Sequence, residues 1–293
     1  MKLYAPSYYN EFKCIADRCR HSCCIGWEIG VDAETLRRYE KLSDAEREEI
    51  CSHIKDGKIQ LCEDGRCPFL DESGLCKIIS RYGDAFTSKI CREHPRFYNF
   101  LTDRAEVGLG ASCPEAARII LSCENYDSII SIGNISAEPS EGYDAKDERK
   151  WIYSTLKDGR VPLENRFLAI MGRYCLSEEL FLKERLSGIL SELEYLREYD
   201  RKLFLSVLSS RIKASEERCE RFFAYLVYRH LSEATSYESL RARLCMCLAL
   251  TKLFESLCST GVESAEAARL ISEEIEYSED NTDSIIFDFE CEL

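Results

Sequence analysis

The sequence lacks long hydrophobic runs, and none approaches the roughly 18 residues that a transmembrane helix needs. We therefore expect no membrane-spanning helix and no membrane partner. The first residues also lack the apolar stretch of a signal peptide, which argues against export by that route. These two absences together predict a cytoplasmic protein.

Basic charge is also scarce, because 39 lysines and arginines face 53 aspartates and glutamates, for a net charge of −14. Proteins that bind DNA or RNA usually carry a basic footprint, and this sequence has no dense lysine or arginine stripe. We therefore expect no nucleic-acid partner. An acidic surface favours cationic partners instead, such as lysines exposed on another protein.

Histidines are few, at four, and no pair of Cys-x2-Cys units stands at the spacing of a zinc ribbon. Cysteine itself is abundant, with 17 residues. An odd count cannot be used up by disulfides alone. In a chain without an export signal, so many cysteines indicate metal binding or redox chemistry.

The cysteines are unevenly distributed, since eleven of the 17 fall within residues 1–125. Gly, Pro, Ser, Asn and acidic residues follow, and then helical periodicity extends almost to the end. We predict a mainly α protein, with an irregular cysteine-rich metal-binding N-terminal domain containing short strands, followed by an all-helical domain. The predicted division is 1–125 for the cysteine-cluster domain, 126–146 for a linker, 147–275 for the helical domain and 276–293 for an acidic C-terminal tail.

Local signals predict individual elements. In the first part we expect a strand over 27–31, a helix over 34–39 capped by Asp32, a helix begun by the capping box of Ser43 and Glu46, a strand over 58–61 and irregular chain over 62–98. Ser112 and Glu115 suggest another capping box. Further helices are expected over about 147–157, 162–174, 177–197, 199–212, 215–235, 238–259 and 263–275.

The cysteines fall into classes according to their surroundings. Thiolates are soft ligands that suit Zn²⁺ or iron–sulfur clusters, and irregular Gly- and Pro-rich chain favours ligand-bearing loops. The strongest candidates are Cys19, Cys23, Cys67, Cys76 and Cys91, followed by Cys14, Cys24 and Cys113. Neighbours such as Cys23 and Cys24 are expected to project in different directions. The core-like cysteines at 175, 219, 245, 247, 258 and 291 are interpreted as small buried hydrophobes. Spacing alone leaves zinc and iron–sulfur chemistry open.

Taken in order, the cysteine motifs of the first 125 residues resemble the flagellin lysine N-methylase family and the wider group with a cysteine-cluster, zinc- or iron-chelating domain. The stretches that carry the resemblance are Tyr4-Ala5-Pro6 with Phe12-x-Cys14, Cys19-x3-Cys23-Cys24-x-Gly26-Trp27, Cys67-Pro68-Phe69-Leu70-Asp71 with Gly74-Leu75-Cys76, Cys91-Arg92-x2-Pro95-Arg96, and Glu106 followed by Ser112-Cys113-Pro114-Glu115. His94 departs from the family pattern, which usually has an aromatic residue before this proline.

The resemblance implies an enzyme, a bacterial methyltransferase that moves methyl groups from S-adenosylmethionine to lysine side chains of flagellin or a similar surface protein. It also implies an iron–sulfur cluster, most simply of the 4Fe-4S type, with Zn²⁺ as the alternative. The ligands implied by matching motif are Cys19, Cys23, Cys24, Cys67, Cys76 and Cys91, with Cys14 and Cys113 as further candidates.

Other features of the reaction stay open. A lysine ammonium has a pKa of about 10.4 and must lose its proton before it can attack a methyl sulfonium. No residue is singled out as the base, and the usual Gly-rich methyl-donor fingerprint is absent. Gly108-x-Gly110 could form either an anion cradle or a plain turn. Two rival interpretations are a binding module with a structural Zn²⁺ and a redox or metal-handling protein.

Overall fold

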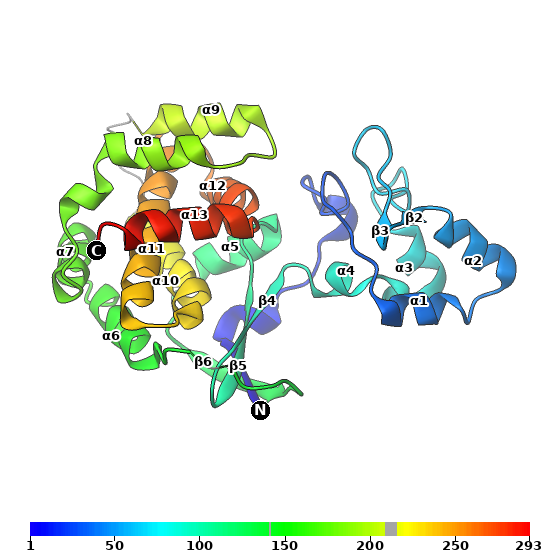
Figure 1. Cartoon of the computed structure of the whole chain (residues 1–293), viewed down its shortest axis with the longest axis horizontal. Coiled ribbons are helices and arrows are strands. Elements are labelled where there is room, and N and C mark those ends of the chain that lie inside the picture. Colours follow the sequence, from blue (N-terminus) through cyan, green and yellow to red (C-terminus); the bar gives the residue numbers. More distant parts are fainter. Residues whose placement is uncertain (141, 209–215) are drawn as a thin grey trace. The chain divides into compact units, whose positions relative to one another are not determined.

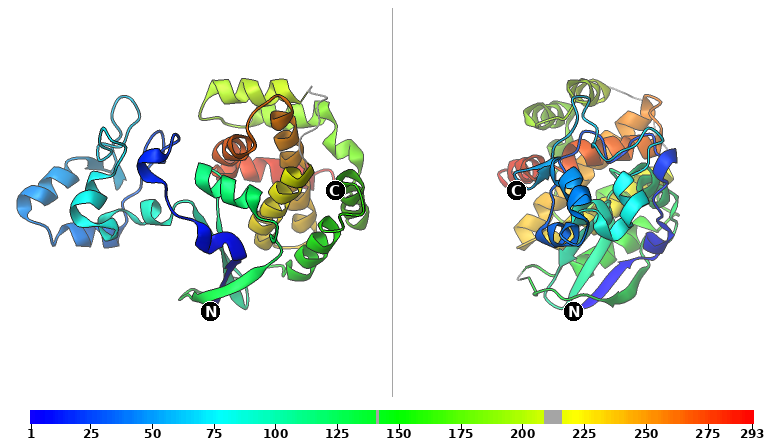
Figure 2. Two further views of the ribbon diagram at one scale, coloured as in Figure 1. Left: turned by 180° about the vertical axis from the view of Figure 1, so that it is seen from behind. Right: turned by 90° about the vertical axis from the view of Figure 1, so that its right-hand side faces the viewer.

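The computed structural model describes residues 1–140, 142–208 and 216–293, and the ribbon is shown in Figures 1 and 2. The chain divides into two compact units, which are residues 13–96 (the cysteine-rich unit) and residues 1–12 with 97–293 (the helical unit). The cysteine-rich unit is thus shorter than the predicted 1–125. The reason is that the chain on either side of it returns to one sheet, in which Lys2 pairs with Arg104.

Helices dominate the described chain, which confirms the predicted mainly α class. The elements of the cysteine-rich unit are short. They are the 3-10 turns η2 (Ala16–Arg18) and η3 (Asp84–Phe86), the helices α1 (Ala33–Tyr39), α2 (Asp44–Cys51), α3 (Lys77–Tyr82) and α4 (Lys89–Glu93), and the strands β2 (Ile54–Lys55) and β3 (Lys58–Ile59). The stretch expected to be irregular, 62–98, therefore contains the short helices α3 and α4 and the first residues of the strand β4 (Arg96–Phe100).

The predicted helix caps are confirmed here. Asp32 accepts a hydrogen bond from the Thr35 backbone N–H at 2.9 Å, and Ser43 and Glu46 form the reciprocal capping box. β2 and β3 pair across Asp56 and Gly57, which both have positive φ as a type I′ turn requires.

The strand expected over 27–31 does not form. Ile29 and Val31 are buried, so the alternation of apolar and polar residues correctly predicted which side chains face the core. Around this segment the chain forms only isolated β-bridges, between Ile25 and Arg66 and between Gly30 and Lys58. A single bridge on each side cannot propagate into a ladder.

The helical unit holds a four-stranded sheet in the order β4-β5-β1-β6, with β1 parallel to β5 and antiparallel to β6. Sequence reasoning placed β6 inside the linker and missed the other three strands. The strands are β1 (Lys2–Pro6), β4 (Arg96–Phe100), β5 (Arg104–Leu109) and β6 (Ile129–Asn134).

Nine α-helices of the described chain belong to this unit: α5 (Pro114–Ser122), α6 (Lys146–Leu156), α7 (Leu163–Arg173), α8 (Lys183–Glu192), α9 (Glu198–Val207), α10 (Glu216–His230), α11 (Tyr237–Ser259), α12 (Ser264–Ile271) and α13 (Glu279–Glu290). Shorter turns are η1 (Ser7–Glu11), η4 (Glu178–Phe181), η5 (Leu231–Glu233) and the π-helix η6 (Ser272–Glu276). Residue 141 of the expected linker, residues 209–212 of the expected helix 199–212 and residue 215 of 215–235 lie outside the described residues.

Several boundaries differ from the prediction. The helix expected over 177–197 is divided into η4, α8 and a non-helical stretch, and the helix expected over 263–275 continues from α12 into the π-helix η6. The N-cap of α5 is Cys113, which makes no side-chain cap hydrogen bond, and Pro114 is the first helical residue, so the expected capping box of Ser112 and Glu115 does not form. The expected acidic tail over 276–293 forms helix α13, because Ile285 and Phe289 are buried and the helix packs against α11. Its acidic residues lie among these apolar positions.

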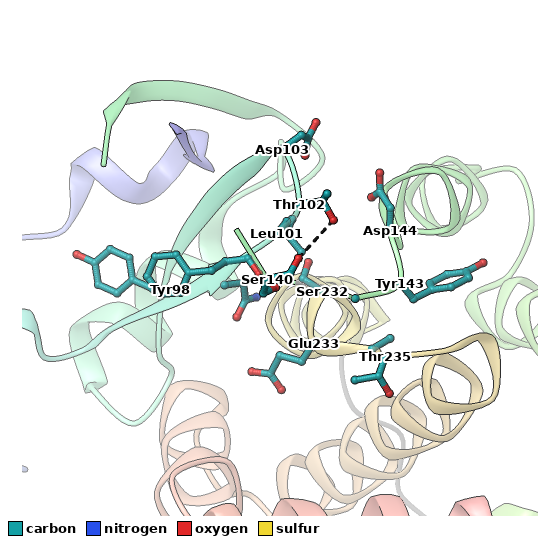
Figure 3. A pocket seen from close by; sticks show the side chains of 14 residues that line it. Tyr98, Leu101, Thr102, Asp103, Ser140, Tyr143, Asp144, Ser232, Glu233 and Thr235 are labelled. Carbon is teal, nitrogen blue, oxygen red and sulfur yellow. Dashed lines mark hydrogen bonds between the residues drawn. The ribbon is translucent and has the colours of Figure 1, made fainter. Parts of the chain in front are cut away.

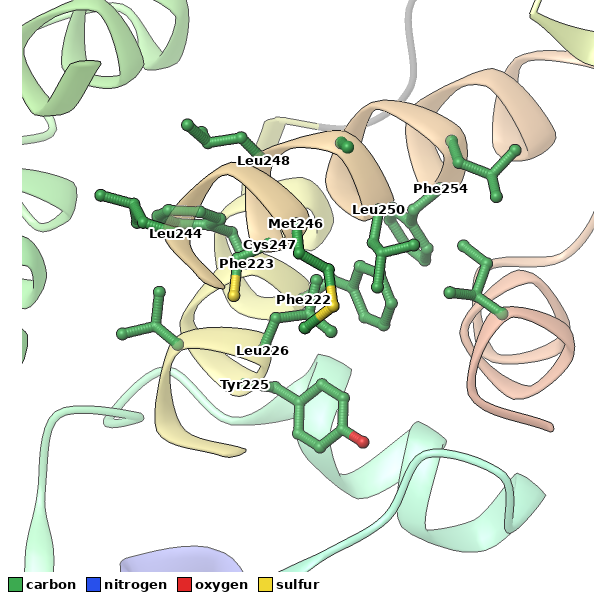
Figure 4. Packing of buried hydrophobic residues seen from close by; sticks show 14 of the residues in the cluster. Phe222, Phe223, Tyr225, Leu226, Leu244, Met246, Cys247, Leu248, Leu250 and Phe254 are labelled. Atoms are coloured by element: carbon green, nitrogen blue, oxygen red, sulfur yellow. The ribbon is translucent and has the colours of Figure 1, made fainter. Parts of the chain in front are cut away.

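The core of the helical unit is built around α10 and α11, as Figure 4 shows. Phe222 and Phe254 stack with ring centroids 4.5 Å apart. Cys245 and Cys247 are fully buried in this core, which confirms their interpretation as small hydrophobes. The same interpretation is wrong for the exposed cysteines at 175 and 291, since each follows a helix end.

None of the helices in the described part of the chain combines the length and the hydrophobicity that crossing a lipid bilayer requires.

Candidate metal centre

Two loops of the cysteine-rich unit are joined through their backbones, and this pairing brings Cys24 beside Cys67. The Cys67 backbone N–H donates to the Cys24 carbonyl at 2.8 Å, and the Gly26 N–H donates to the Gly65 carbonyl at 2.9 Å. Both glycines have positive φ, near +79° and +77°, which other residues adopt only at a cost. The glycines therefore allow two cysteine-bearing turns to lie side by side.

A tight turn positions Cys76. The Asp71 carboxylate accepts hydrogen bonds from the backbone N–H groups of Ser73 and Leu75, each at 2.9 Å. The chain then reverses, and Lys77 N–H donates to the Phe69 carbonyl at 2.7 Å. The turn consequently holds Cys76 at the N-cap of α3, near Cys67.

Cys91 lies on the short helix α4, which is tied to α1 by Asp32. Besides capping α1, the Asp32 carboxylate accepts a hydrogen bond from Lys89 N–H at 2.7 Å. Burial raises the pKa of Asp32, but the hydrogen bonds from Lys89 and Thr35 outweigh it and hold the pKa well below the usual range. The Cys91 sulfur lies 3.3 Å from the Ser88 hydroxyl.

Four thiols influence one another electrostatically. Burial raises the pKa of Cys67 to about 12, and the charges of Cys24, Cys76 and Cys91 add to the effect. Burial and the charge of Cys24 also raise the pKa of Cys76 and of Cys91. These thiols thus share one neighbourhood, drawn from four separate segments of the sequence.

Cys23 and Cys24 interact directly, contrary to the expectation that their side chains diverge. Their thiols hydrogen-bond each other, which raises the pKa of Cys23 and lowers that of Cys24 to about 6. The Cys23 pKa is also raised by the charges of Cys91 and Cys14. The Cys23–Cys24 pair therefore loses one proton more readily than an isolated thiol does.

The remaining candidates are Cys14, Cys19 and Cys113. Cys14 is exposed, and its sulfur accepts a hydrogen bond from the Ala16 N–H at 3.4 Å. Cys19 is partly exposed at the end of η2. Cys113 belongs to the helical unit, where it begins α5.

The donor chemistry of the cluster suits a soft metal ion or an iron–sulfur cluster, since buried thiols that repel one another as thiolates are stabilised by a bound cation. The geometry is not preformed. Among the residues that the structure describes, no three histidine, cysteine, aspartate or glutamate side chains are placed to hold one metal ion. The ligand set therefore stays a prediction.

Trp27 lies beside this cluster in sequence and is half-buried. Its ring contacts the ring of His94, with centroids 6.0 Å apart. Burial lowers the pKa of His94 to about 4, helped by the charge of Arg96, so the imidazole is neutral near pH 7. A neutral ring packed on Trp27 replaces the aromatic residue that the family pattern led us to expect here.

The glycine pair of the helical unit spans the end of β5 and the start of a turn, in which the Cys113 N–H donates to the Gly110 carbonyl at 3.5 Å, so Gly110 fits the plain-turn alternative. Gly108 lies inside β5, and a Cβ there would meet the Phe97 ring at 2.3 Å. A Cβ on Gly110 would meet the Tyr277 hydroxyl at 2.3 Å and Arg229 Nη1 at 3.1 Å. Both glycines are therefore required by close packing, which a lone sequence pattern could not reveal.

Glu106, one of the residues that carry the family resemblance, is buried and charge-paired. The Arg149 guanidinium donates to its two oxygens at 2.6 and 2.7 Å, and Arg104 Nε donates at 2.9 Å. Although burial raises the pKa of Glu106, these two arginines lower it overall. Sequence reasoning could not identify Arg149, because it is 43 residues away.

Comparison with known proteins gives partial matches. No family model and no solved structure matches the chain. The chain is 32% identical over 127 residues to the "Lysine-N-methylase" proteins of Salmonella typhimurium and Salmonella choleraesuis. It is 29% identical over 127 residues to the "Flagellar biosynthetic protein FliU" of Salmonella muenchen.

The coverage of these matches is unequal. Each covers 40% of this chain, but the share of the relative is 32% for the two lysine methylases and 75% for FliU. The match thus spans about a third of the length of the curated lysine methylases. Over this stretch the comparisons confirm the resemblance to the flagellin lysine N-methylase family that the cysteine motifs predicted.

Proposed function

We propose that this protein is a lysine N-methyltransferase that transfers methyl groups from S-adenosylmethionine to lysines of flagellin or a similar surface protein. The observation that carries the proposal is the 127-residue similarity to proteins named lysine-N-methylase. The name of the third relative, a flagellar biosynthetic protein, supports flagellin as the acceptor.

The proposal includes a metal centre in the cysteine-rich unit. Its core ligands would be Cys24, Cys67, Cys76 and Cys91, which influence one another electrostatically. Cys14, Cys19, Cys23 and Cys113 complete the candidate set. Four thiolates satisfy a 4Fe-4S cluster, which is the favoured occupant, and equally a structural Zn²⁺, which is the alternative.

The chain itself must supply binding and proton handling for the methyl transfer. The acceptor lysine needs an environment that lowers its pKa from about 10.4 or a base that removes its proton. The metal centre, when bound, would hold the short loops of its unit in place. We propose a cytoplasmic location, where thiols stay reduced and flagellin can be modified before export.

Two rival functions make different predictions. A binding module with a structural Zn²⁺ would be colourless and would not bind S-adenosylmethionine. A redox or metal-handling protein would be coloured or would release metal readily, again without a methyl-donor site. The similarity to named methylases favours the enzyme over both.

The deciding experiment incubates anaerobically purified protein with S-adenosylmethionine and flagellin, and detects methyl-lysine by mass spectrometry. We expect methyl-lysine with the wild type and with Cys62→Ser, because Cys62 is exposed on a turn. We expect none with Cys91→Ser. Metal-replete protein that neither binds S-adenosylmethionine nor methylates flagellin would contradict the proposal.

A further inference from the structure

The helical unit contains a cavity of about 630 Å³ that no sequence pattern indicated. Three segments line it: residues 98–103 along and beyond β4, residues 140 and 142–144 before α6, and residues 232–235 in η5 and just after it. Figure 3 shows their side chains around one opening. The cavity lies wholly within one unit, so its walls are defined by that unit's own packing.

One wall of the cavity is a sheet edge. β4 is the terminal strand in the order β4-β5-β1-β6, with a neighbouring strand on one side only among the described residues. The wall continues through the turn to Thr102, whose hydroxyl donates to the Ser140 carbonyl at 3.4 Å. An edge strand beside a groove is a site where an extended peptide can align.

The ionisable side chains that line the cavity are all acidic. The ionisable acids and bases among its lining residues are Asp103, Asp144 and Glu233, with no lysine, arginine or histidine. Their side chains are 64%, 59% and 45% exposed. They come from three separate segments and do not reflect one acidic run, and each lies beside an arginine: Arg104 beside Asp103 and Asp144, and Arg243 beside Glu233.

Each carboxylate is anchored through one oxygen. Asp103 Oδ1 accepts from Arg104 at 3.0 Å, Asp144 Oδ1 accepts from the Lys146 N–H at 3.0 Å, and Glu233 Oε2 accepts from Arg243 at 2.7 Å. A carboxylate has two oxygens with several acceptor positions, so each can still accept from a ligand.

The floor beneath the opening is rigid. Arg104 is buried and bridges Asp103 to Glu106, which Arg149 also binds. Ser232, a lining residue, accepts a hydrogen bond from Arg149 at 3.1 Å. Asp103 and Asp144, whose carboxylates both lie within 4 Å of Arg104, are therefore attached to a buried ion network before any ligand arrives, whereas Glu233 is held separately by Arg243.

We infer that this acidic groove binds an extended, lysine-bearing segment of the protein that the enzyme methylates. The segment lies along the edge of β4, and its ammonium groups face Asp103, Asp144 and Glu233. The inference rests on the proposed function for the identity of the occupant. Charge complementarity selects a cationic peptide, and the strand edge selects an extended one.

The test uses full-length, metal-replete protein and a fluorescein-labelled peptide of alternating threonine and lysine. Binding is followed by anisotropy without S-adenosylmethionine. The double variant Asp103→Asn with Glu233→Gln should bind about tenfold more weakly, because it removes two charges near the surface. The matched control, Glu124→Gln with Glu198→Gln, removes two exposed charges elsewhere in the same unit and should bind like the wild type.

A variant that adds a negative charge to the groove tests whether misfolding, and not lost charge, explains weaker peptide binding. Thr235 is an exposed lining residue, so Thr235→Glu adds a carboxylate to the groove. It should tighten peptide binding, whereas Thr235→Arg should weaken it. Replacement of the peptide lysines by acetyl-lysine should abolish binding to every variant.

The outcomes separate this inference from the proposed function. Equal binding by the wild type and the groove variants, equal weakening by the control pair, or no binding by the wild type would overturn the groove. Unchanged KM for flagellin in the double variant would also overturn it while leaving the methylase intact. Loss of peptide binding in the variants of a protein that transfers no methyl groups would sustain the groove and refute the proposed function.

Discussion

The two units use cysteine in opposite ways. In the helical unit Cys245 and Cys247 are fully buried in a helix and pack like small apolar side chains. In the cysteine-rich unit Cys24 lies on a turn, Cys76 caps α3 and Cys91 lies on the short helix α4. Cys24 and Cys76 are partly accessible, Cys91 is exposed, and the three thiols are close enough for the charge of Cys24 to raise the pKa of the other two. Cysteine is thus a buried apolar residue in the helical unit and a candidate metal ligand in the cysteine-rich unit.

The units also differ in how much core they have. The cysteine-rich unit spans residues 13–96, and its cluster of buried apolar side chains has nine members, one of which is Cys67. A core this small rarely holds so long a segment, and natural proteins of this kind add disulfides or a metal. The helical unit buries a large continuous core and needs no such help.

The largest effect that tests this comparison is loss of the metal ligands. Cys67→Ser or Cys91→Ser should release the metal and unfold residues 13–96, since structural metal binding is worth about 10 kcal/mol or more. The helical unit should keep its protection against hydrogen exchange. The measurement is elemental analysis combined with hydrogen exchange resolved by segment.

The matched controls for that experiment are Cys62→Ser, which is exposed in the same unit, and Cys258→Ser, which lies in the helical unit. Both should retain the metal. Equal metal loss from all four variants would show that cysteine class and metal binding are unrelated.

The next effect concerns a buried charge in the helical unit. Burial raises the pKa of Glu276, but the charge of Arg229 and the hydrogen bond with His230 bring it from 4.5 down to about 2. Because the folded pKa is lower, this carboxylate contributes about 3 kcal/mol above pH 4.5, and the contribution disappears as the pH falls toward 2.

Urea unfolding of the helical unit between pH 7 and pH 3 should show this loss. Glu276→Gln should be less stable at pH 7 and should lack this part of the pH dependence. An identical pH profile for the variant and the wild type would mean that Glu276 is not the group responsible.

A smaller effect is expected from packing at one glycine. Gly110→Ala places a methyl group within 2.3 Å of the Tyr277 hydroxyl, and overpacking of this kind costs about 1–3 kcal/mol. Gly172→Ala in α7, where no atom lies within 4 Å of the new Cβ, should instead stabilise by about 0.5–1 kcal/mol. Thermal unfolding of both variants gives the two signs, and a loss from both would contradict the packing argument.

The smallest effect lies in the cysteine-rich unit. Ser43→Ala removes the capping box of α2 and should cost about 1 kcal/mol. Hydrogen exchange of α2 should speed up while that of α10 stays unchanged. If the metal dominates the stability of this unit, the effect will be seen only locally and not in the global unfolding midpoint.

Sequence reasoning succeeded where signals are local. The caps at Asp32 and Ser43 and most helices of the second half follow from side-chain chemistry within one or two turns. It failed for the sheet, because β1 and β5 meet across a hundred residues. β5 also carries Arg104 and Glu106, and charged residues are not expected in a buried strand. They are tolerated here because they pair with each other and because Glu106 also pairs with Arg149.

The candidate site shows the same division. Irregular, glycine-marked chain was the signal by which the candidate cysteines were chosen, although Cys91 lies on helix α4. Their convergence depends on backbone pairing between distant loops, such as Cys67 with Cys24. The acidic groove could not be predicted at all, since its three segments come together only through the fold.

The most direct measurement of the central claim is the metal content and visible spectrum of protein purified without oxygen, together with its binding of S-adenosylmethionine. The account predicts brown protein with about four irons per chain that binds the methyl donor. Colourless protein with zinc and no affinity for S-adenosylmethionine would contradict it and would leave a structural metal module in place of a methylase.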